Sequence, residues 1–194
     1  MGTTGTDVPR VHAVTRGEWR AWLAEHHQSA RSVWLVMWKK HTGKPAVSYD
    51  DAVSEALAVG WVDSKGQRLD DDRTMLFFTP RKPGSGWSGP NKVRIAALER
   101  DGLMTETGAK LVADARADGS WSLLDDVENL VEPPDLAAAL DAEPAARGHW
   151  DAFPRSARRA LLLWVLTAKR PETRERRITE IATRAAIDER ANGA

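Results

Sequence analysis

The chain has no cysteine among its 194 residues. This absence excludes disulfides, thiolate nucleophiles and zinc–thiolate sites. Acidic and basic residues balance at 28 each, so no net charge would draw the chain to nucleic acid or to a membrane surface. The N-terminus lacks the apolar segment of a signal peptide, and no stretch reaches the ~20 apolar residues of a membrane span. We therefore expect a soluble cytoplasmic protein with no membrane span.

Tryptophan is the abundant aromatic residue, with nine copies against one tyrosine and three phenylalanines. The indole ring buries a large area and keeps one N–H donor, so it suits a core or the wall of a ligand site. We expect core packing for about two-thirds of the tryptophans. The others are candidates for a binding surface.

Hydrophobic periodicity predicts an α+β fold, with a small sheet of about three strands and flanking helices followed by a C-terminal helical module. The strands are expected at residues 32–39, 61–69 and 74–79. Helix caps are expected at Thr15, Ser48, Thr105 and Ser156. The expected organisation is a flexible N-terminus, an α+β domain, an acidic linker and a helical module packed on the first part, at residues 1–14, 15–124, 125–134 and 135–190.

A loop rich in proline and glycine, residues 79–91, follows the last predicted strand. The surrounding stretch FFTPRKPGSGWSGPNK, residues 77–92, carries three basic side chains, one tryptophan and no acid. Strand alternation places Trp61, Asp63 and Lys65 on one face, so the loop could fold its cations and indole over them. The candidate ligand-binding residues are Trp61, Asp63, Lys65, Arg73, Phe77, Thr79, Arg81, Lys82, Trp87, Ser88 and Asn91.

A structural alternative is equally open. In that alternative Asp63 pairs with Arg73 or Arg81, and Trp87 closes the sheet edge beneath a rigid loop. No nucleophile elbow, P-loop, dinucleotide fingerprint or HExxH motif is present, so we name no catalytic residue. The acidic turn 70–72 lacks the spaced ligands of a calcium loop, and the five histidines are scattered. We expect no metal and no cofactor.

Residues 55–92 resemble the YdeI/OmpD-associated family. The family pattern joins EAL-x-x-GW-[IV]-DS to a stretch like FTPR-[KR]-P-x-S-x-WS, and this chain has EALAVGWVDS at 55–64 and FTPRKPGSGWS at 78–88. The tail TAKRPETRERRI, residues 167–178, is similar to the closing helical module of the family. The resemblance covers about residues 15–185. The family is also labelled bacteriocin-protection, which implies a role in resisting toxic molecules and supplies no catalytic residues.

Three functions follow from these features. The first is a non-enzymatic bacterial stress or self-protection protein that binds a small aromatic or anionic molecule, such as a toxin, under the 79–91 loop. The second is a nucleic-acid-binding protein that uses the basic loop and the basic C-terminal helix; it ranks lower because the net charge is zero. The third, an enzyme with Asp63 as acid or base, ranks last. The sequence gives neither the ligand nor the oligomeric state.

Overall fold

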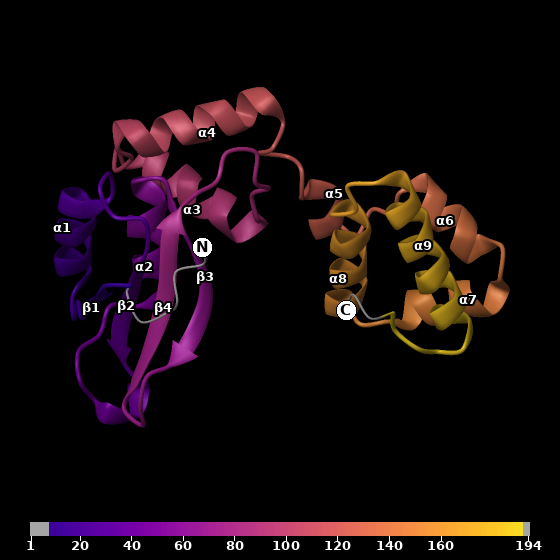
Figure 1. Ribbon diagram of the computed structural model, residues 1–194, viewed down its shortest axis with the longest axis horizontal. Helices are drawn as coiled ribbons and strands as arrows, with labels where there is room; N and C mark the ends of the chain where they lie inside the picture. The colour runs from indigo at the N-terminus through magenta and orange to yellow at the C-terminus, as the bar shows by residue number, and fades with distance from the viewer. Residues whose placement is uncertain (1–7, 192–194) are drawn as a thin grey trace. The chain divides into compact units, whose positions relative to one another are not determined.

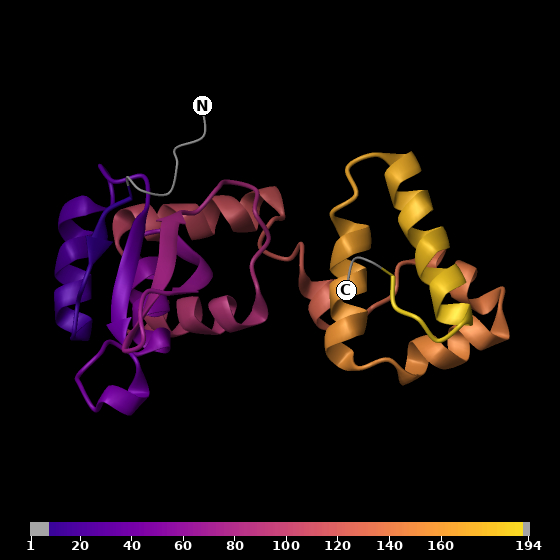
Figure 2. The same cartoon turned by 60° about the horizontal axis from the view of Figure 1, so that its bottom comes forward.

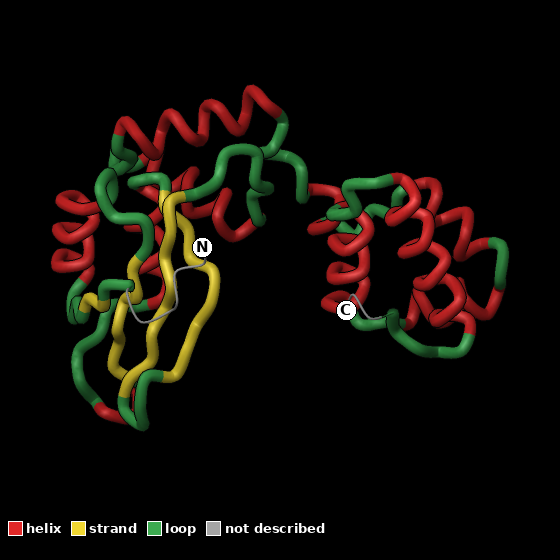
Figure 3. The backbone as a smooth tube through the Cα atoms, in the orientation of Figure 1, coloured by secondary structure: helices red, strands yellow, loops and turns green. Residues whose placement is uncertain are grey.

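The computed structural model describes residues 8–191. The chain divides into two compact units, residues 1–121 and 122–194. A four-stranded sheet and its helices form the first unit, and helices alone form the described part of the second (Figures 1 and 3). The predicted α+β class with a C-terminal helical region is confirmed.

The sheet has the strand order β1-β2-β4-β3. Its strands are β1 (Arg10–Val11), β2 (Val33–Trp38), β3 (Trp61–Arg68) and β4 (Arg73–Pro80). The short strand β1 runs parallel to β2, whereas β2 and β3 both run antiparallel to β4. The prediction missed β1, because two residues are too few to produce an alternating pattern. Residues 8–14 of the expected flexible N-terminus thus include a strand, and residues 1–7 lie outside the described part.

The helices α1, α2 and α4 of the first unit begin where a side chain satisfies a free backbone amide. The Thr15 hydroxyl accepts from the Glu18 N–H at 3.2 Å, and Ser48 accepts from Asp51 at 3.0 Å, as predicted. Thr105 caps its helix in the same way. The helices are α1 (Arg16–His26), α2 (Tyr49–Ala58), α3 (Gly89–Arg100) and α4 (Glu106–Asp118), with a short 3₁₀ helix, η1 (Lys40–Thr42).

One face of the sheet packs against the helices and forms the main core of the first unit (Figures 1 and 2). Three tryptophans of this core, Trp19, Trp61 and Trp87, are at most 2% exposed. The indole N–H of Trp19 donates to the Ala52 carbonyl at 3.0 Å, and that of Trp61 donates to the His27 carbonyl at 3.1 Å. The indole N–H groups of Trp19 and Trp61 therefore have hydrogen-bond partners inside the core, as buried indoles require.

The opposite side of the sheet, here called the open face, carries a smaller apolar cluster without any described helical residue. Its cross-strand pairs are Trp34 with Phe77, Val36 with Met75, and Trp38 with Arg73. Because side chains alternate along a strand, these six residues point away from the main core. Strand β2 therefore contributes apolar side chains to both faces of the sheet.

Helix α4 lies very close to the end of α2. Both the backbone N–H and the hydroxyl of Thr105 donate to the Ala58 carbonyl, at 3.0 and 2.8 Å. A Cβ at Gly108 would lie 2.2 Å from that same carbonyl oxygen. Glycine at position 108 therefore permits the contact between the two helices.

The second unit has its own core, which includes Leu136, Leu140, Trp150, Leu161 and Ile181. Its helices are α5 (Asp125–Glu128), α6 (Pro134–Asp141), α7 (Pro144–Ala152), α8 (Arg155–Leu166) and α9 (Pro171–Ala186). None of the described helices combines the length and apolar character that crossing a membrane requires.

Two details of the second unit differ from the sequence prediction. The stretch expected as an irregular linker, 125–134, includes α5, whose Val127 is buried in the core. The helix expected to begin with Ser156 as its cap begins at Arg155 instead. Its N-cap residue is Pro154, and no side chain makes a capping hydrogen bond there. The expected packing of residues 135–190 on the first part stays a prediction.

Candidate functional site

The 79–91 loop is closed by hydrogen bonds within itself. The Arg81 backbone N–H donates to the Gly60 carbonyl at 2.9 Å, which fixes the start of the loop. The Ser85 hydroxyl donates to the Lys82 carbonyl at 2.6 Å, and Nη2 of Arg81 donates to the carbonyls of Ser85 and Gly86. The loop is therefore a built structure rather than a loose connector.

Arg81 is a buried cation, only 8% exposed. Its guanidinium carbon lies 3.7 Å from the centre of the Trp87 ring, close enough for a strong cation–π contact. No carboxylate pairs with Arg81 in the described part of the chain, and its Nε has no hydrogen-bond partner there. Burial lowers the pKa of Arg81 to about 10, so the side chain still carries its charge at pH 7.

A cavity of about 30 Å³ adjoins Arg81 beneath the loop. This volume holds about one or two water molecules and is too small for an aromatic ring. Two acids line it with Arg81. Asp114 is 2.8 Å from Lys110, and hydrogen bonding to Ser120 holds the pKa of Asp118 below its usual range. Both carboxylates therefore already have partners.

The predicted grouping of Trp61, Asp63 and Lys65 on one face is wrong. Asp63 lies opposite Phe78 and Gly66 lies opposite Leu76, so two residues of β3 face the single residue Phe77. This β-bulge adds one residue and changes the alternation. Lys65 accordingly lies on the open face, with Nζ 5.5 Å from the centre of the Phe77 ring.

Asp63 occupies a hydrogen-bond acceptor position beside α2. Its Oδ2 accepts from the hydroxyl of Tyr49 at 2.9 Å. Burial is the main reason that the pKa of Tyr49 is raised, and the hydrogen bond to Asp63 adds to it. The alternative pairing of Asp63 with Arg73 or Arg81 is wrong, since Arg73 pairs with Asp70 at 2.6 Å. The described residues contain no cluster of three metal-ligating side chains.

The remaining predicted site residues are spread over the first unit. Lys82 is exposed at the loop surface. Ser88 is the N-cap residue of α3, where its side chain makes no capping bond. The Asn91 side chain accepts from Arg94 at 3.2 Å, and Thr79 is half-buried in β4 opposite Val62. The candidate residues thus divide between the main core, the loop and the open face.

The open face contains functional candidates that the sequence reasoning missed. Nζ of Lys44 lies 3.9 Å from the centre of the Trp38 ring, and Nζ of Lys65 lies 5.7 Å from that of Trp34. Neither lysine has an ion pair in the described part of the chain. The sequence signal for this face was the strand 32–39, which carries tryptophans at alternating positions. Trp34 and Trp38 lie on the face whose apolar cluster includes no described helical residue.

The basic C-terminal segment is largely engaged within the helical unit. Arg174 makes two hydrogen bonds to Asp135, at 2.6 and 2.8 Å, and Arg177 donates to the Trp164 carbonyl at 2.5 Å. Arg159 pairs with Glu128 at 2.6 Å. In these pairs, acidic residues of α5 and α6 neutralise basic residues of α8 and α9. Of the basic tail residues, only Arg174 pairs with a carboxylate in the described part of the chain, so a nucleic-acid site that uses this tail stays a prediction.

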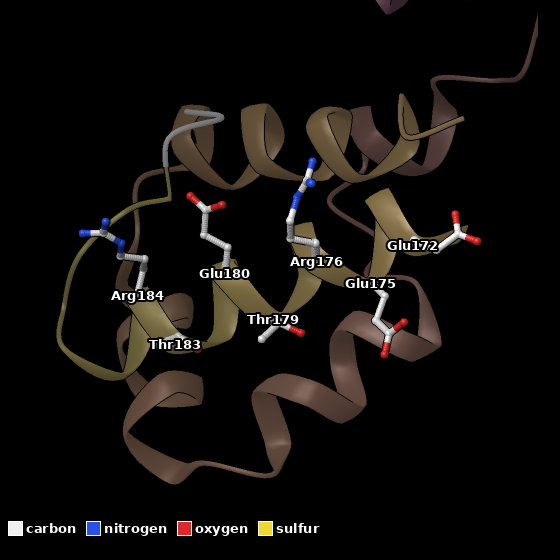
Figure 4. A pocket seen from close by; sticks show the side chains of 7 residues that line it. All are labelled: Glu172, Glu175, Arg176, Thr179, Glu180, Thr183 and Arg184. Atoms are coloured by element: carbon white, nitrogen blue, oxygen red, sulfur yellow. The ribbon is translucent and has the colours of Figure 1, made fainter. Parts of the chain in front are cut away.

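Two hollows lie on the helical unit. One, of about 470 Å³, runs along α9, where acidic and basic side chains are interspersed (Figure 4). The other, of about 220 Å³, is more apolar and includes Val131, which is 50% exposed. The mixed charge along α9 favours neither an anion nor a cation, so the first hollow offers no defined chemistry.

The fold and the site define a two-unit α+β protein with a buried arginine beneath a closed loop. A family model described as Domain of unknown function (DUF8412) matches residues 11–111, and one described as Bacteriocin-protection, YdeI or OmpD-Associated matches residues 129–186. Since the first match spans more than half of the chain, the protein belongs to the DUF8412 family, and its helical unit carries the YdeI/OmpD-associated domain. Neither curated proteins nor solved structures gave a match.

The family resemblance drawn from the sequence is therefore confirmed at residues 129–186, which contain the similar tail 167–178. The motif stretch 55–92, on which the resemblance chiefly rested, lies within the other match. The bacteriocin-protection description thus attaches to the helical unit. The loop with Arg81 belongs to the DUF8412 region.

Proposed function

We propose that this protein is a non-enzymatic bacterial protection protein that binds a small anionic group beneath the 79–91 loop. The YdeI/OmpD-associated match supports a bacteriocin-protection or YdeI-like role for the chain. The observation that carries the binding proposal is the buried charge of Arg81, which has no carboxylate partner in the described residues and an unsatisfied Nε. The cytoplasmic location expected from the sequence stays a prediction.

A buried charge normally has a counter-charge or a full set of hydrogen bonds, because removing it from water is costly. Arg81 has two carbonyl acceptors for Nη2 and the Trp87 ring, but no ion pair in the described part of the chain. Asp114 and Asp118, which line the same cavity, are already bonded to Lys110 and Ser120. An anion that accepts from Nε would supply both missing partners at once. The closed loop already holds the guanidinium in place, so binding would require little reordering.

The size of the cavity selects the kind of anion. A cavity of about 30 Å³ can hold a chloride ion. It can also hold the carboxylate group of formate, or that of a larger molecule whose remainder lies outside the cavity. The aromatic ligand considered from the sequence has no such support, because Trp61 and Trp87 are both buried in the core. Lys82, exposed on the same loop, also lines the cavity and would add positive charge beside the anion.

The proposal predicts a saturable response to chloride and to formate at constant ionic strength. Binding beside Trp87 should change its fluorescence, and it should raise the unfolding temperature because only the folded state binds. The variant Arg81→Met keeps the packing on Trp87 without the charge, so it should lose both responses. Lys40→Met, at an exposed lysine of η1 that does not line the cavity, is the control and should retain them.

Two results would count against the proposal. One is a response that rises linearly with salt and never saturates. The other is an equal response in wild type and Arg81→Met, which would place the anion elsewhere. A folded Arg81→Met variant that is more stable than wild type and silent to anions would instead agree with it, since a buried unpaired charge is destabilising.

A further inference from the structure

We propose that the open face of the sheet is a second binding site, which takes single-stranded nucleic acid by base stacking. This site does not depend on Arg81 or its cavity. It also differs from the nucleic-acid surface considered from the sequence, which combined the loop with the C-terminal helix.

The aromatic rings of the open face are held rigidly by the sheet. Trp34 and Phe77 are directly opposite each other on β2 and β4, with ring centres 4.8 Å apart and planes tilted by 53°. Trp38 lies four residues further along β2, roughly 13 Å away at the rise of a strand. Trp34 is almost covered, whereas Phe77 and Trp38 are half-buried. The His12 ring lies 5.0 Å from that of Trp38, so Phe77 is the ring more open to a base. Every base has a flat π face that can stack on such rings.

Three cations near these rings, Lys44, Lys65 and Arg10, have no ion pair within residues 8–191, whereas Arg73 near Trp38 pairs with Asp70. Lys44 lies over Trp38, and Lys65 lies over both Trp34 and Phe77. Arg10 on β1 pairs in register with Trp34 and is exposed. An exposed lysine over a ring is held only weakly. A stacking base can therefore replace each ammonium group on the ring, and the freed lysine can pair with a phosphate.

Charge also determines which occupant fits. A protein with an apolar surface would have to bury the ammonium groups of Lys44 and Lys65, which is unfavourable without counter-charges. Double-stranded nucleic acid hides its base faces and could not use the rings. The acidic turn at one end of the face is already engaged, since Arg73, Arg68 and His41 pair with Asp70, Asp71 and Asp72. This turn lines a hollow with Trp38 and would repel phosphate there, so the strand should lie chiefly over Phe77 and Lys65.

The test is fluorescence anisotropy of a labelled oligothymidylate with the full-length protein over a series of salt concentrations. Wild type should bind the single strand saturably, with affinity that falls as salt rises. The double variant Lys44→Glu/Lys65→Glu should bind at least tenfold more weakly, and the salt dependence should fall by about one unit per lysine. The control Lys169→Glu reverses an exposed lysine in the helical unit and should bind like wild type.

A second variant separates stacking from simple charge attraction. Phe77→Leu keeps the apolar volume but removes the ring, so it should weaken binding several-fold while the salt dependence stays unchanged. Thermal unfolding of Phe77→Leu shows whether a loss of binding comes from misfolding. If it does, the double lysine variant alone tests the proposal. The proposal is overturned by the absence of saturable binding, by equal binding of duplex DNA, or by wild-type affinity in the double lysine variant.

Discussion

Glu55 joins the first two helices of the chain through a buried carboxylate. It is 4% exposed and accepts from Nε of Arg20 at 2.7 Å and from Nε of Arg16 at 2.5 Å. Burial by itself would raise the pKa of Glu55. The hydrogen bonds and charges of Arg20 and Arg16 together outweigh the effect of burial, so the pKa of Glu55 lies below the ordinary value of 4.5. The ionised carboxylate therefore stabilises the contact between α1 and α2.

This arrangement predicts a pH-dependent loss of stability. Because the pKa of Glu55 is lower in the folded state, its contribution is present at neutral pH and disappears as the pH falls below about 4.5. Glu55→Gln should reduce the free energy of unfolding at pH 7 by about 2 kcal/mol. The difference in the free energy of unfolding between wild type and Glu55→Gln should shrink as the pH falls below about 4.5. Urea unfolding measures this difference, and Glu25→Gln is the exposed control. A difference that stays constant with pH would contradict the assignment.

The tryptophans illustrate what the sequence could predict at single residues. Their chemistry indicated core packing for about two-thirds of them without saying which, and Trp19 is buried together with the two ligand-binding candidates Trp61 and Trp87. The sequence could not tell whether Trp61 and Trp87 would also share a ligand wall, since that depends on how distant segments pack. Arg81 shows the same limit: its type marked it as a cation, but only the folded loop reveals that it is buried without a counter-charge.

At the scale of elements, the contact between α4 and α2 depends on the absence of a side chain at one position. Gly108→Ala would place a Cβ 2.2 Å from the Ala58 carbonyl oxygen, and a backbone atom cannot yield like the end of a side chain. The free energy of unfolding should fall by about 2 kcal/mol, although alanine alone favours a helix over glycine.

Gly17→Ala in α1 is the matched control, because its nearest atom would be 4.0 Å away. That change should be neutral or slightly stabilising. Chemical unfolding of both variants measures the difference. If Gly108→Ala were as stable as Gly17→Ala, the two helices would not be as closely held as the Thr105 hydrogen bonds indicate.

Most helices and strands could be predicted to within a few residues, because caps and hydrophobic periods are local properties of the sequence. The failures occurred where the signal was too short or depended on pairing. The two residues of β1 carry no period, and α5 is only four residues long. The β-bulge near Lys65 cannot be read from alternation, since it exists only relative to β4. That bulge moved Lys65 to the open face and divided the candidate site.

At the scale of the whole molecule, the two units have separate hydrophobic cores. The described core of the second unit draws every member from residues 127–191. It includes Trp150, whose indole N–H donates to Glu132 within the same unit at 2.6 Å. We therefore expect residues 122–194 to fold alone.

Circular dichroism and thermal unfolding of the isolated fragment test this expectation. A cooperative helical transition that Leu140→Ala lowers in both the fragment and the full chain is the expected result, since Leu140 is completely buried. A fragment with little helix, or with a broad non-cooperative melt, would show that the core needs the first unit. The control substitution is Leu123→Ala, at a residue that is 45% exposed.

The β-bulge has a further consequence because β3 forms an outer edge of the sheet. An outer strand with regular geometry offers unpaired backbone groups to the strands of other molecules and so invites aggregation. In β3 the extra residue interrupts that row of groups, and Lys65 and Arg68 add charge along it. The other edge strand, β1, is only two residues long. Both edges of the sheet thus resist edge-to-edge pairing with other molecules. The aromatic open face can therefore stay uncovered by helices without making the protein prone to form fibrils.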